Sequence, residues 1–562
     1  MRVQGVLTAA LLAASIRLWS GCGESTATRG KTVLVCLDGG TWESITPLLQ
    51  AGQLPNTLEM MSEGAYGPLL ADPPYSPPSW TSLATGLTPE HHGITNFVRR
   101  SETDRETHEY QLVPIGAVDV EVPRIWDMVA TQGLEVNVQR WLFTYPIEEV
   151  AGVMVSDFQG KATDFLSSKP IEATLRERFQ PSLFITADAR LTRDRALSHD
   201  PPRSPERFRE RDAKLARAVR DIDAAEQAFD YVLNHHPEID FHTVSFFWGN
   251  QIQHEYLHYW LAPAAYGADA EEAERYREVI PDLYRIFDAF IGRLRSDPRV
   301  DNVMVVSDHG MQLIPLDIET NIGAYHFQIL WDEILADLGF DEVVRPVAYA
   351  RTETGLSIGA GVEKREQLRG ELATALESLH FADSDTPLFE DVAPPPGAWP
   401  DLLVGRYAGV RYGDIPRLFD RPVRRGDGES FPAGRYLRFA GGFIRAEHGY
   451  DLNPDVALGE QGILLLSGPD VAGGLRLEAG VASTIDVTPT LLYLMGLPVG
   501  ADMDGRVLQE VVRAEALDSR PVVSVPSYRS LVPERVFPAE AHSDDRYDEK
   551  TMERLRSLGY VN

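Results

Sequence analysis

Short apolar runs alternate with stretches of helical apolar spacing along most of the chain. The first run, TVLVCLD at 32–38, is continuously apolar between its end residues, which is typical of a strand buried on both faces of a parallel sheet. Residues 42–64 follow with helical spacing, a turn at 54–56 and Gly64 at the end. Three later strand-like runs end in polar residues and lie at 152–158, 240–250 and 301–311. This alternation predicts an α/β fold with a doubly wound, mostly parallel central sheet.

The alternation of strand and helix is interrupted twice. Residues 200–234 carry opposite charges at helical spacing, which predicts a helix with a solvated face. Residues 312–440 contain APPPGAWP and several glycine-rich turns without a regular period, so we interpret them as an inserted cap. The core pattern returns with QGILLLSGPDV and a helix that begins near Asp486 or Thr488. We therefore assign a core to 30–311 and 441–510, a helical insertion to about 160–240, a cap to 312–440 and a C-terminal tail to 511–562.

Residues 1–22 have the pattern of an export signal. A basic start is followed by a short apolar stretch that ends in small residues, and the stretch is too short for a membrane-spanning helix. The ending WSGC is similar to a bacterial lipoprotein cleavage box, in which Cys22 would be acylated, although Arg17 and Trp19 depart from the usual pattern. We expect export to the periplasm or cell surface, with Cys22 as the site of a lipid anchor.

Composition narrows the choice of partners. The formal charge of −31, from 84 acidic and 53 basic residues, argues against nucleic acid or anionic lipid as the main partner. Membrane contact is therefore expected only through the lipid anchor. A small anionic substrate would need a local positive centre, which a metal ion could supply, although acidity can also serve only to solvate the surface. The two cysteines, Cys22 and Cys36, exclude a disulfide framework and a thiolate zinc cluster.

Candidate ligands for metal ions stand where the predicted strands end. Asp38 ends the first strand, Asn250 follows the run that begins at 240, and Asp308 and His309 follow the run that begins at 301. Each alone is more often a turn or cap residue, but parallel strands bring their carboxyl ends to one sheet edge. Carboxylates and imidazoles are ligands for zinc and similar ions, so Asp38, Asp308 and His309 predict a three-ligand site with an open position. His254 and His448 could serve a second ion.

Ser76 is the candidate nucleophile. It lies in YSPPSWTSLATGL, between an aromatic residue and two prolines, at the start of a predicted helix. A hydroxyl at the open position of the first site would be deprotonated by the field of the cation. We also expect the helix N-terminus behind Ser76 to offer backbone N–H groups and its dipole to an anionic oxygen.

These motifs together give a resemblance to a known family. Seven segments occur in the order that the family has: LDGGTWESITPLLQAGQLPNTLEMMSEGAYG, PPYSPPSWTSLATGLTPEHHGI, TYPIEEVAGVMVSDF, QIQH, VVSDHGM, EHG and IDVTPTLLYLMGLPVGADMDGR. The chain resembles the alkaline phosphatase superfamily, and within it the type I phosphodiesterase / nucleotide pyrophosphatase branch. The resemblance implies a core of alkaline-phosphatase type, a small phosphorylated substrate, and a phosphoseryl intermediate formed on Ser76.

The resemblance also implies the ligands of two divalent ions, zinc or else manganese or calcium. Asp38, Ser76, Asp308 and His309 would surround one ion, and Asn250, His254 and His448 the other. The family has an aspartate where this chain has Asn250, which removes one negative charge and is expected to weaken the second site.

Four further residues near these motifs are weaker candidates for substrate or metal binding. Asn96 is close to, but one position out of register with, a family asparagine that holds a phosphoryl oxygen, so it is a candidate substrate-binding residue. His91 and His92 are interpreted as loop residues. His258 is interpreted as a histidine on a helix surface, with metal binding as the alternative.

The resulting hypothesis is an exported, metal-dependent phosphoric ester hydrolase. A sulfatase is disfavoured because no arginine follows Ser76 in the required spacing. A phosphotransferase or mutase could use the same site. A non-enzymatic alternative is a degenerate ligand-binding protein that holds a single ion, if the second site is lost because Asn250 replaces an aspartate.

Overall fold

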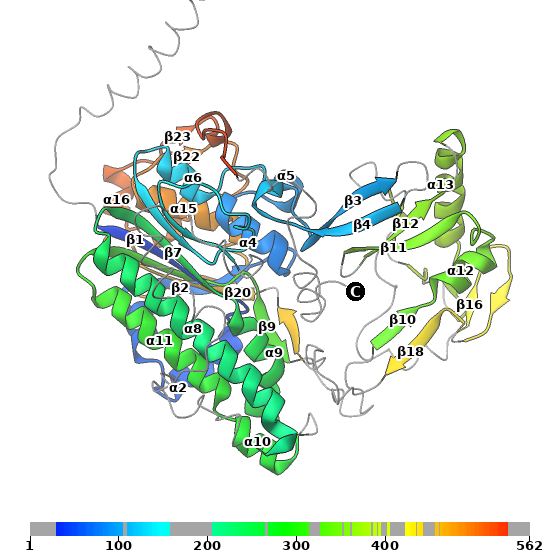
Figure 1. The fold of residues 1–562 in the computed structure, drawn as a ribbon, viewed down its shortest axis with the longest axis horizontal. Coiled ribbons are helices and arrows are strands. Elements are labelled where there is room, and N and C mark those ends of the chain that lie inside the picture. The colour runs from blue at the N-terminus through cyan, green and yellow to red at the C-terminus, as the bar shows by residue number, and fades with distance from the viewer. Residues whose placement is uncertain are drawn as a thin grey trace, which may run out of the picture.

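The computed structural model describes residues 30–104, 109–157, 205–264, 268–313, 326–350, 353–359, 362–383, 386–389, 392–394, 402–404, 422–433, 435–441, 456–459 and 461–537. Cys22, the export signal and His448 lie outside them. The larger lobe, on the left of Figure 1, is built around an eight-stranded sheet. Its order is β21 (Leu475–Arg476), β2 (Ala65–Leu70), β20 (Gln461–Ser467), β8 (Val300–Val306), β1 (Lys31–Leu37), β7 (Ile239–Phe246), β5 (Glu135–Gln139) and β6 (Gly152–Val155).

The sheet is mostly parallel, as predicted. Only β20 runs against its neighbours β8 and β2, so β2 points the same way as β1 and β8. Side chains of β1 alternate between two hydrophobic cores: Leu34 and Cys36 enter one, while Val33 and Val35 enter the other. Both faces of the sheet are therefore buried, which explains why its strands read as continuous apolar runs.

Helices cover both faces of this sheet (Figure 1). The core that contains Val33 and Val35 also receives side chains from α2 (Trp42–Gln50), α3 (Pro55–Glu63), α8 (Arg209–His235), α9 (Trp248–Leu261), α10 (Ala270–Tyr276) and α11 (Val279–Ser296). The opposite core receives side chains from α4 (Ser76–Thr85), α6 (Ile125–Ala130) and α15 (Val487–Leu494). This is the doubly wound arrangement expected from the sequence.

A smaller lobe, drawn in green and yellow on the right of Figure 1, has a hydrophobic core of its own. It contains α12 (Trp331–Leu338), α13 (Val362–Glu377) and a four-stranded sheet of β11 (Val344–Ala350), β12 (Glu353–Ile358), β15 (Leu402–Val404) and β14 (Val392–Ala393). It also contains β10 (His326–Ile329), β18 (Leu437–Gly441), β13 (His380–Phe381), β16 (Val423–Arg424) and β17 (Ser430–Phe431). Trp331 stacks on Phe389 with ring centroids 5.3 Å apart. The hairpin of β3 (Val98–Asp104) and β4 (Glu109–Pro114) points from the main sheet toward this lobe.

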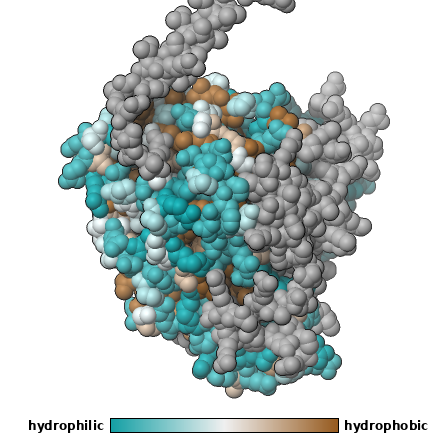
Figure 2. Space-filling model, turned by 60° about the vertical axis from the view of Figure 1, so that its left-hand side comes forward, coloured by the Kyte–Doolittle hydropathy of each residue, from teal (hydrophilic) through white to brown (hydrophobic). Residues whose placement is uncertain are grey.

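The surface agrees with the acidic composition. Figure 2 shows a face on which hydrophilic residues cover most of the coloured area and hydrophobic residues form small areas between them. Within the described residues, the exposed large hydrophobic side chains are Leu58, Leu531 and Val536. No helix in the described ranges combines the length and the apolar character needed to cross a membrane.

Candidate active site

The sheet register brings the first three predicted ligands to one edge. Leu37 of β1 pairs with Phe246 of β7, and Cys36 pairs with Val306 of β8, so both flanking strands end beside Asp38. Asp308 and His309 follow β8 directly. All three side chains are buried, and their ligand atoms lie within 4.8 Å of one another.

The distances in this group are those of a compact ligand set. Nε2 of His309 lies 3.3 Å from Oδ2 of Asp308 and 3.5 Å from Oδ1 of Asp38. The hydroxyl oxygen of Ser76 lies 3.2 Å from the same nitrogen. Ligand atoms bound to one tetrahedral zinc ion at about 2.1 Å would be about 3.4 Å apart. The three distances to Nε2 of His309 are therefore close to those expected around a single ion.

The orientation of the His309 ring follows from its second nitrogen. Nδ1 lies 2.8 Å from the carbonyl oxygen of Gly310, which can only accept a hydrogen bond. Nδ1 therefore carries a proton, and Nε2 faces the two carboxylates and Ser76. A backbone carbonyl that fixes the tautomer in this way is common behind metal-binding histidines.

Within the part of the chain that the structure describes, each of the two carboxylates has a buried oxygen without a hydrogen bond, which a bound cation could contact. Oδ1 of Asp38 and Oδ2 of Asp308 are buried and have no hydrogen-bond partner among the described residues. Burial, and next the charge of Asp308, raise the pKa of Asp38 well above its usual value. Adjacent buried carboxylates are costly unless they are protonated or coordinate a metal. The residues present therefore fit a divalent ion.

Ser76 reaches the group from the end of β2, which points the same way as β1 and β8. Two residues connect the strand to the cis Asp72–Pro73 bond, and α4 then begins at Ser76. Tyr75 is the extended residue that precedes the helix, and the Ser76 side chain is buried.

The expectation about backbone donors at this helix is wrong. Pro77 and Pro78 occupy the first turn and have no N–H, and the amide of Ser79 already donates to the carbonyl of Tyr75 at 3.1 Å. Of these first-turn amides, only that of Ser76 is left to meet an anionic oxygen.

Asn96 lies beside this helix entry. Its Oδ1 accepts hydrogen bonds from the Tyr75 hydroxyl at 3.2 Å and from the Phe97 amide at 2.7 Å. The structure places Asn96 next to the residue that precedes Ser76, and its predicted role in substrate binding stays a prediction.

The candidates for the second ion share α9, apart from His448. Asn250 and His254 are buried on that helix. A Cβ atom on Gly39 would lie 3.4 Å from Cα of Asn250, and one on Gly249 would lie 3.0 Å from the carbonyl oxygen of Asp38. The absence of side chains at these two glycines therefore lets the first turn of α9 approach the end of β1 closely.

His258 differs from its sequence interpretation. Its side chain is buried instead of lying on the helix surface, and burial lowers its pKa to about 4. Its ring centroid is 3.9 Å from that of Tyr259. The sequence could not show this, because the partners that cover α9 come from distant parts of the chain.

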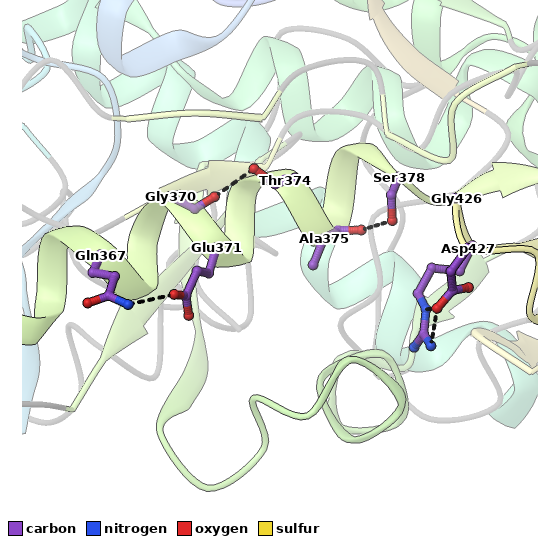
Figure 3. A pocket seen from close by; sticks show the side chains of 9 residues that line it. Gln367, Gly370, Glu371, Thr374, Ala375, Ser378, Gly426 and Asp427 are labelled. Atoms are coloured by element: carbon purple, nitrogen blue, oxygen red, sulfur yellow. Dashed lines mark hydrogen bonds and ion pairs between the residues drawn. The ribbon is translucent and has the colours of Figure 1, made fainter.

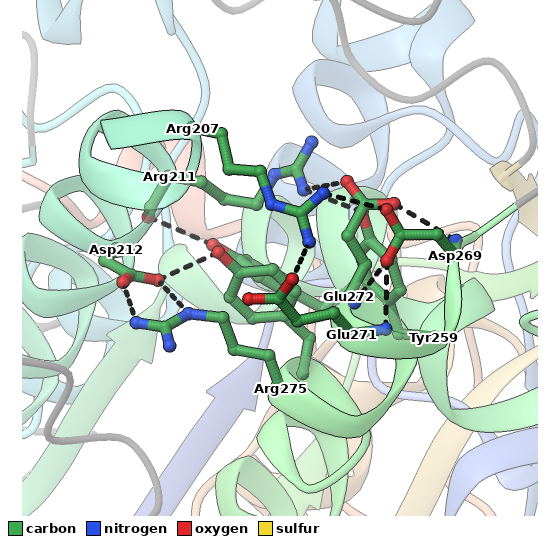
Figure 4. A network of polar contacts seen from close by, with 10 residues as sticks. Arg207, Arg211, Asp212, Tyr259, Asp269, Glu271, Glu272 and Arg275 are labelled. Atoms are coloured by element: carbon green, nitrogen blue, oxygen red, sulfur yellow. Dashed lines mark hydrogen bonds and ion pairs between the residues drawn. The ribbon is translucent and has the colours of Figure 1, made fainter. Parts of the chain in front are cut away.

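A polar and aromatic network holds the outer half of α9 (Figure 4). Arg211 of α8 donates to the Tyr259 hydroxyl at 2.7 Å, and the Tyr256 hydroxyl donates to the Arg211 carbonyl at 3.1 Å. The buried carboxylate of Asp212 accepts from Arg275 and, at 2.9 Å, from the Tyr276 hydroxyl. The charged helix predicted at 200–234 therefore buries part of its charge against α9 and α10, besides presenting a solvated face.

His91 and His92 are not part of the Asp38 group. His91 is exposed and lies 2.8 Å from Asp504, whereas His92 is buried. The backbone amide of Ile94 donates to Nδ1 of His92, and Nε2 lies 3.2 Å from the Ser82 hydroxyl. Both histidines therefore have structural contacts in and around the short helix α5 (Pro89–His92).

A separate groove lies on the smaller lobe, between α13 and the turn at Gly426 (Figure 3). Its polar side chains bond to one another: Gln367 donates to Glu371 at 2.8 Å, and Arg425 donates to Asp427 at 2.8 Å. None of the predicted site residues lines it. We therefore place the candidate active site at the edge of the main sheet.

At the carboxyl edge of this doubly wound sheet lie two carboxylates, an imidazole and a serine hydroxyl, which are groups that metal-assisted hydrolysis can use. A profile of the type I phosphodiesterase / nucleotide pyrophosphatase family matches residues 32–382, which is more than half of the 562 residues. The chain belongs to this family, and it is a hydrolase of the phosphodiesterase and phosphatase type.

Solved structures of known proteins are similar at low identity. Phosphonoacetate hydrolase from Sinorhizobium meliloti is 15% identical, with 83% of this chain and 95% of that chain covered and a TM-score of 0.44. Human ectonucleotide pyrophosphatase / phosphodiesterase 5 is 14% identical, with 86% and 100% covered and a TM-score of 0.46. Alkaline phosphatase PafA is 13% identical, with 87% and 100% covered and a TM-score of 0.47. Comparison with the curated proteins gives no match.

Proposed function

We propose that the protein is a metal-dependent phosphoric ester hydrolase that uses Ser76 as its nucleophile. The observation that carries the proposal is the position of the Ser76 hydroxyl, 3.2 Å from Nε2 of His309 in the buried Asp38–Asp308–His309 group. A divalent ion bound by Asp38, Asp308 and His309 would supply positive charge that favours the serine alkoxide and offsets the phosphoryl charge.

The residues of the chain have distinct roles in this reaction. The Ser76 hydroxyl loses its proton to solvent, and its oxygen bonds phosphorus as the bond to the opposite alkoxide breaks; the alkoxide leaves and takes a proton from solvent. Water then breaks the bond between phosphorus and the Ser76 oxygen, which releases the phosphate product and restores the serine hydroxyl. Pro77 and Pro78 limit the backbone freedom of the first turn of α4 and so hold the oxygen in place. Asn96, whose side chain lies beside the helix entry, binds a non-bridging phosphoryl oxygen in this proposal.

A second ion is part of the proposal. Asn250, His254 and His448 would hold it, with zinc as the first choice and manganese or calcium as alternatives. Asn250 lacks the charge of a carboxylate, and this specific feature also favours the competing proposal of a single-ion binding protein. Measurement of metal content and turnover in the same sample separates the two.

The decisive experiment is an activity screen of the purified protein with added Zn²⁺, Mn²⁺ or Ca²⁺. Aryl phosphodiesters, aryl phosphomonoesters, phosphonates and sulfate esters are compared, and the product is analysed in the presence of an alcohol acceptor. We expect hydrolysis of a phosphoric ester that chelation abolishes and metal restores. Phosphoryl transfer to the alcohol as the main outcome would instead indicate a phosphotransferase, and metal uptake without turnover would reject the enzyme.

We also propose that the protein is exported and anchored at Cys22. The support is the signal-like pattern of residues 1–22 and the WSGC ending. Mass spectrometry of the mature N-terminus tests this: a diacylglycerol-modified Cys22 is expected, and an N-terminus at Met1 would contradict it.

A further inference from the structure

Two residues outside the predicted ligand set connect the two halves of the candidate active site. Gln253 of α9 immediately precedes His254, and Tyr284 lies on α11. Gln253 donates through Nε2 to the carbonyl of Gly39 at 2.8 Å and to that of Gly249 at 3.3 Å. Tyr284 donates its hydroxyl to Oε1 of Gln253 at 3.0 Å. Both side chains are buried.

The directions of these hydrogen bonds are fixed by chemistry. The carbonyl oxygens of Gly39 and Gly249 can only accept, so the amide nitrogen of Gln253 must face them. Its oxygen then faces Tyr284, whose hydroxyl must donate. The Tyr284 oxygen in turn accepts from the backbone amide of Thr41 at 3.1 Å. Because burial raises the pKa of Tyr284, this hydroxyl stays protonated and remains a donor.

The chain of bonds ends on a predicted metal ligand. The Gly39 amide donates to Oδ1 of Asp308 at 3.2 Å, so the residue whose carbonyl Gln253 holds also contacts one carboxylate through the peptide unit that precedes it. Gly39 has a φ of +71°, a conformation that suits glycine because it has no side chain. The position of Gly39 therefore depends on the hydrogen bonds that its backbone makes with Gln253 and Asp308. Gln253 thus fixes both the loop that carries Asp38 and the first turn of α9.

We propose that Gln253 and Tyr284 are positioning residues, which set the distance between the Asp38–Asp308–His309 group and the α9 residues Asn250 and His254. This inference rests on the proposed two-ion function and goes beyond it, because neither side chain touches the substrate or an ion. Groups that orient metal ligands typically change metal affinity by about 10–100-fold when they are removed. The ion on the α9 side is the one that should respond, since Asn250 already makes that site weak.

The test compares three variants of the full mature protein. Gln253→Met keeps the length of the side chain but removes its hydrogen bonds, and Tyr284→Phe removes only the hydroxyl. Tyr256→Phe is the matched control, because Tyr256 lies on the same helix and loses one buried hydrogen bond, to Arg211, away from Gly39. Zn²⁺ is titrated into metal-free protein by calorimetry, and the melting temperature of each metal-free variant is recorded.

In Gln253→Met we expect the weaker Zn²⁺ step to lose about 10–100-fold in affinity while the tighter step changes less than about threefold. In Tyr284→Phe we expect a loss of about threefold to tenfold in the same step. In Tyr256→Phe we expect both steps to match wild type although the melting temperature falls. The activity lost by Gln253→Met is expected to return at high Zn²⁺.

Unchanged affinities in the first two variants, or an equal loss in all three, would overturn the inference, as would a wild-type chain with one uptake step. If Gln253→Met does not fold, Tyr284→Phe decides alone. Turnover of an aryl phosphodiester by wild type tests the proposed function separately. Absence of that turnover, with two ions bound, would reject the hydrolase while the titrations still decide the role of Gln253.

Discussion

The hydroxyl oxygen of Ser76 lies 3.2 Å from Nε2 of His309, although 233 positions separate the two residues in the chain. The sheet explains the proximity. Strands β2 and β8 point the same way, and each ends at the edge where its following residues meet. A nucleophile at the start of α4 and a ligand at the end of β8 are therefore brought together by the sheet and not by local sequence.

Replacement of Ser76 by alanine is expected to abolish turnover without removing the metal. The variant loses the attacking oxygen, so kcat should fall by at least about 10³-fold. Asp38, Asp308 and His309 remain, so metal content should stay near that of wild type. Ser79→Ala is the matched control, because Ser79 lies on the same helix and bonds only the Pro73 carbonyl through its hydroxyl. A Ser76→Ala variant with the wild-type rate would exclude the serine from the mechanism.

Replacement of Asp308 by asparagine is expected to separate metal affinity from stability. Asparagine can keep the bond from the Gly39 amide but lacks the charge, so metal content and activity should fall together. Without metal, the variant should be more stable than wild type by about 1 kcal/mol or more, because the repulsion with Asp38 disappears. With metal at about 100 times its Kd, wild type should gain about 2.7 kcal/mol and the variant little.

Melting curves with and without Zn²⁺, together with metal analysis, measure both effects. The order of stability of the two proteins should reverse on addition of metal. Full metal occupancy in Asp308→Asn would contradict the assignment of this carboxylate as a ligand.

The strand ends were predictable from the sequence because apolar runs mark them. Asp38 and the Asp308–His309 pair each follow such a run, and parallel strands share their carboxyl edge. Strand β2 was not predictable from such a run, because Gly67 and Pro68 interrupt it. The structure tolerates Pro68 because β21 pairs with β2 only at Ala65 and Tyr66, so β2 has an unpaired side at the proline.

The positioning contacts were not predictable from sequence spacing. Gln253 bonds Gly39 across 214 positions, and Tyr284 bonds Gln253 across 31. The prolines after Ser76 are evident in the sequence, but the prediction that this helix N-terminus offers backbone N–H groups was wrong. Pro77 and Pro78 remove amides that a helix N-terminus usually offers. Residues that end helices or strands can be predicted from the sequence pattern, whereas contacts between side chains of different helices depend on the packing itself.

Replacement of Asn250 by aspartate is expected to increase the affinity for the second ion. The side chain is buried beside Gly39, so an added carboxylate would meet little solvent screening. We expect the weaker Zn²⁺ step to tighten by about tenfold or more, and the metal-free protein to become less stable because a further buried charge is unpaired. Calorimetric titration and melting curves measure the two changes. Asn250→Ala, which removes the oxygen, should shift the affinity in the opposite direction, and equal affinities in both variants would remove residue 250 from the site.

The buried ring of His92 predicts a loss of stability in acid. The Ile94 amide donates to Nδ1, so the proton of the neutral ring lies on Nε2, which hydrogen-bonds the Pro78 backbone and lies 3.2 Å from the Ser82 hydroxyl of α4. Burial lowers the pKa of His92 from 6.5 to about 4. Between these two values the unfolded chain binds a proton that the folded chain does not. Stability is therefore fully present above pH 6.5 and falls as the pH drops toward 4.

For one such histidine the loss between pH 6.5 and 4 is about 3 kcal/mol. His92→Gln keeps a donor and an acceptor but cannot titrate, so its free energy of unfolding should depend less steeply on pH than that of wild type. Urea unfolding of metal-free protein at pH 7, 5.5 and 4 measures the difference. His235→Gln, at the exposed end of α8, is the control. Because His242 and His258 are also buried and their pKa values are also lowered, wild type and both variants should all lose stability in acid, but only His92→Gln should lose less. Parallel pH profiles for the two variants would contradict the assignment.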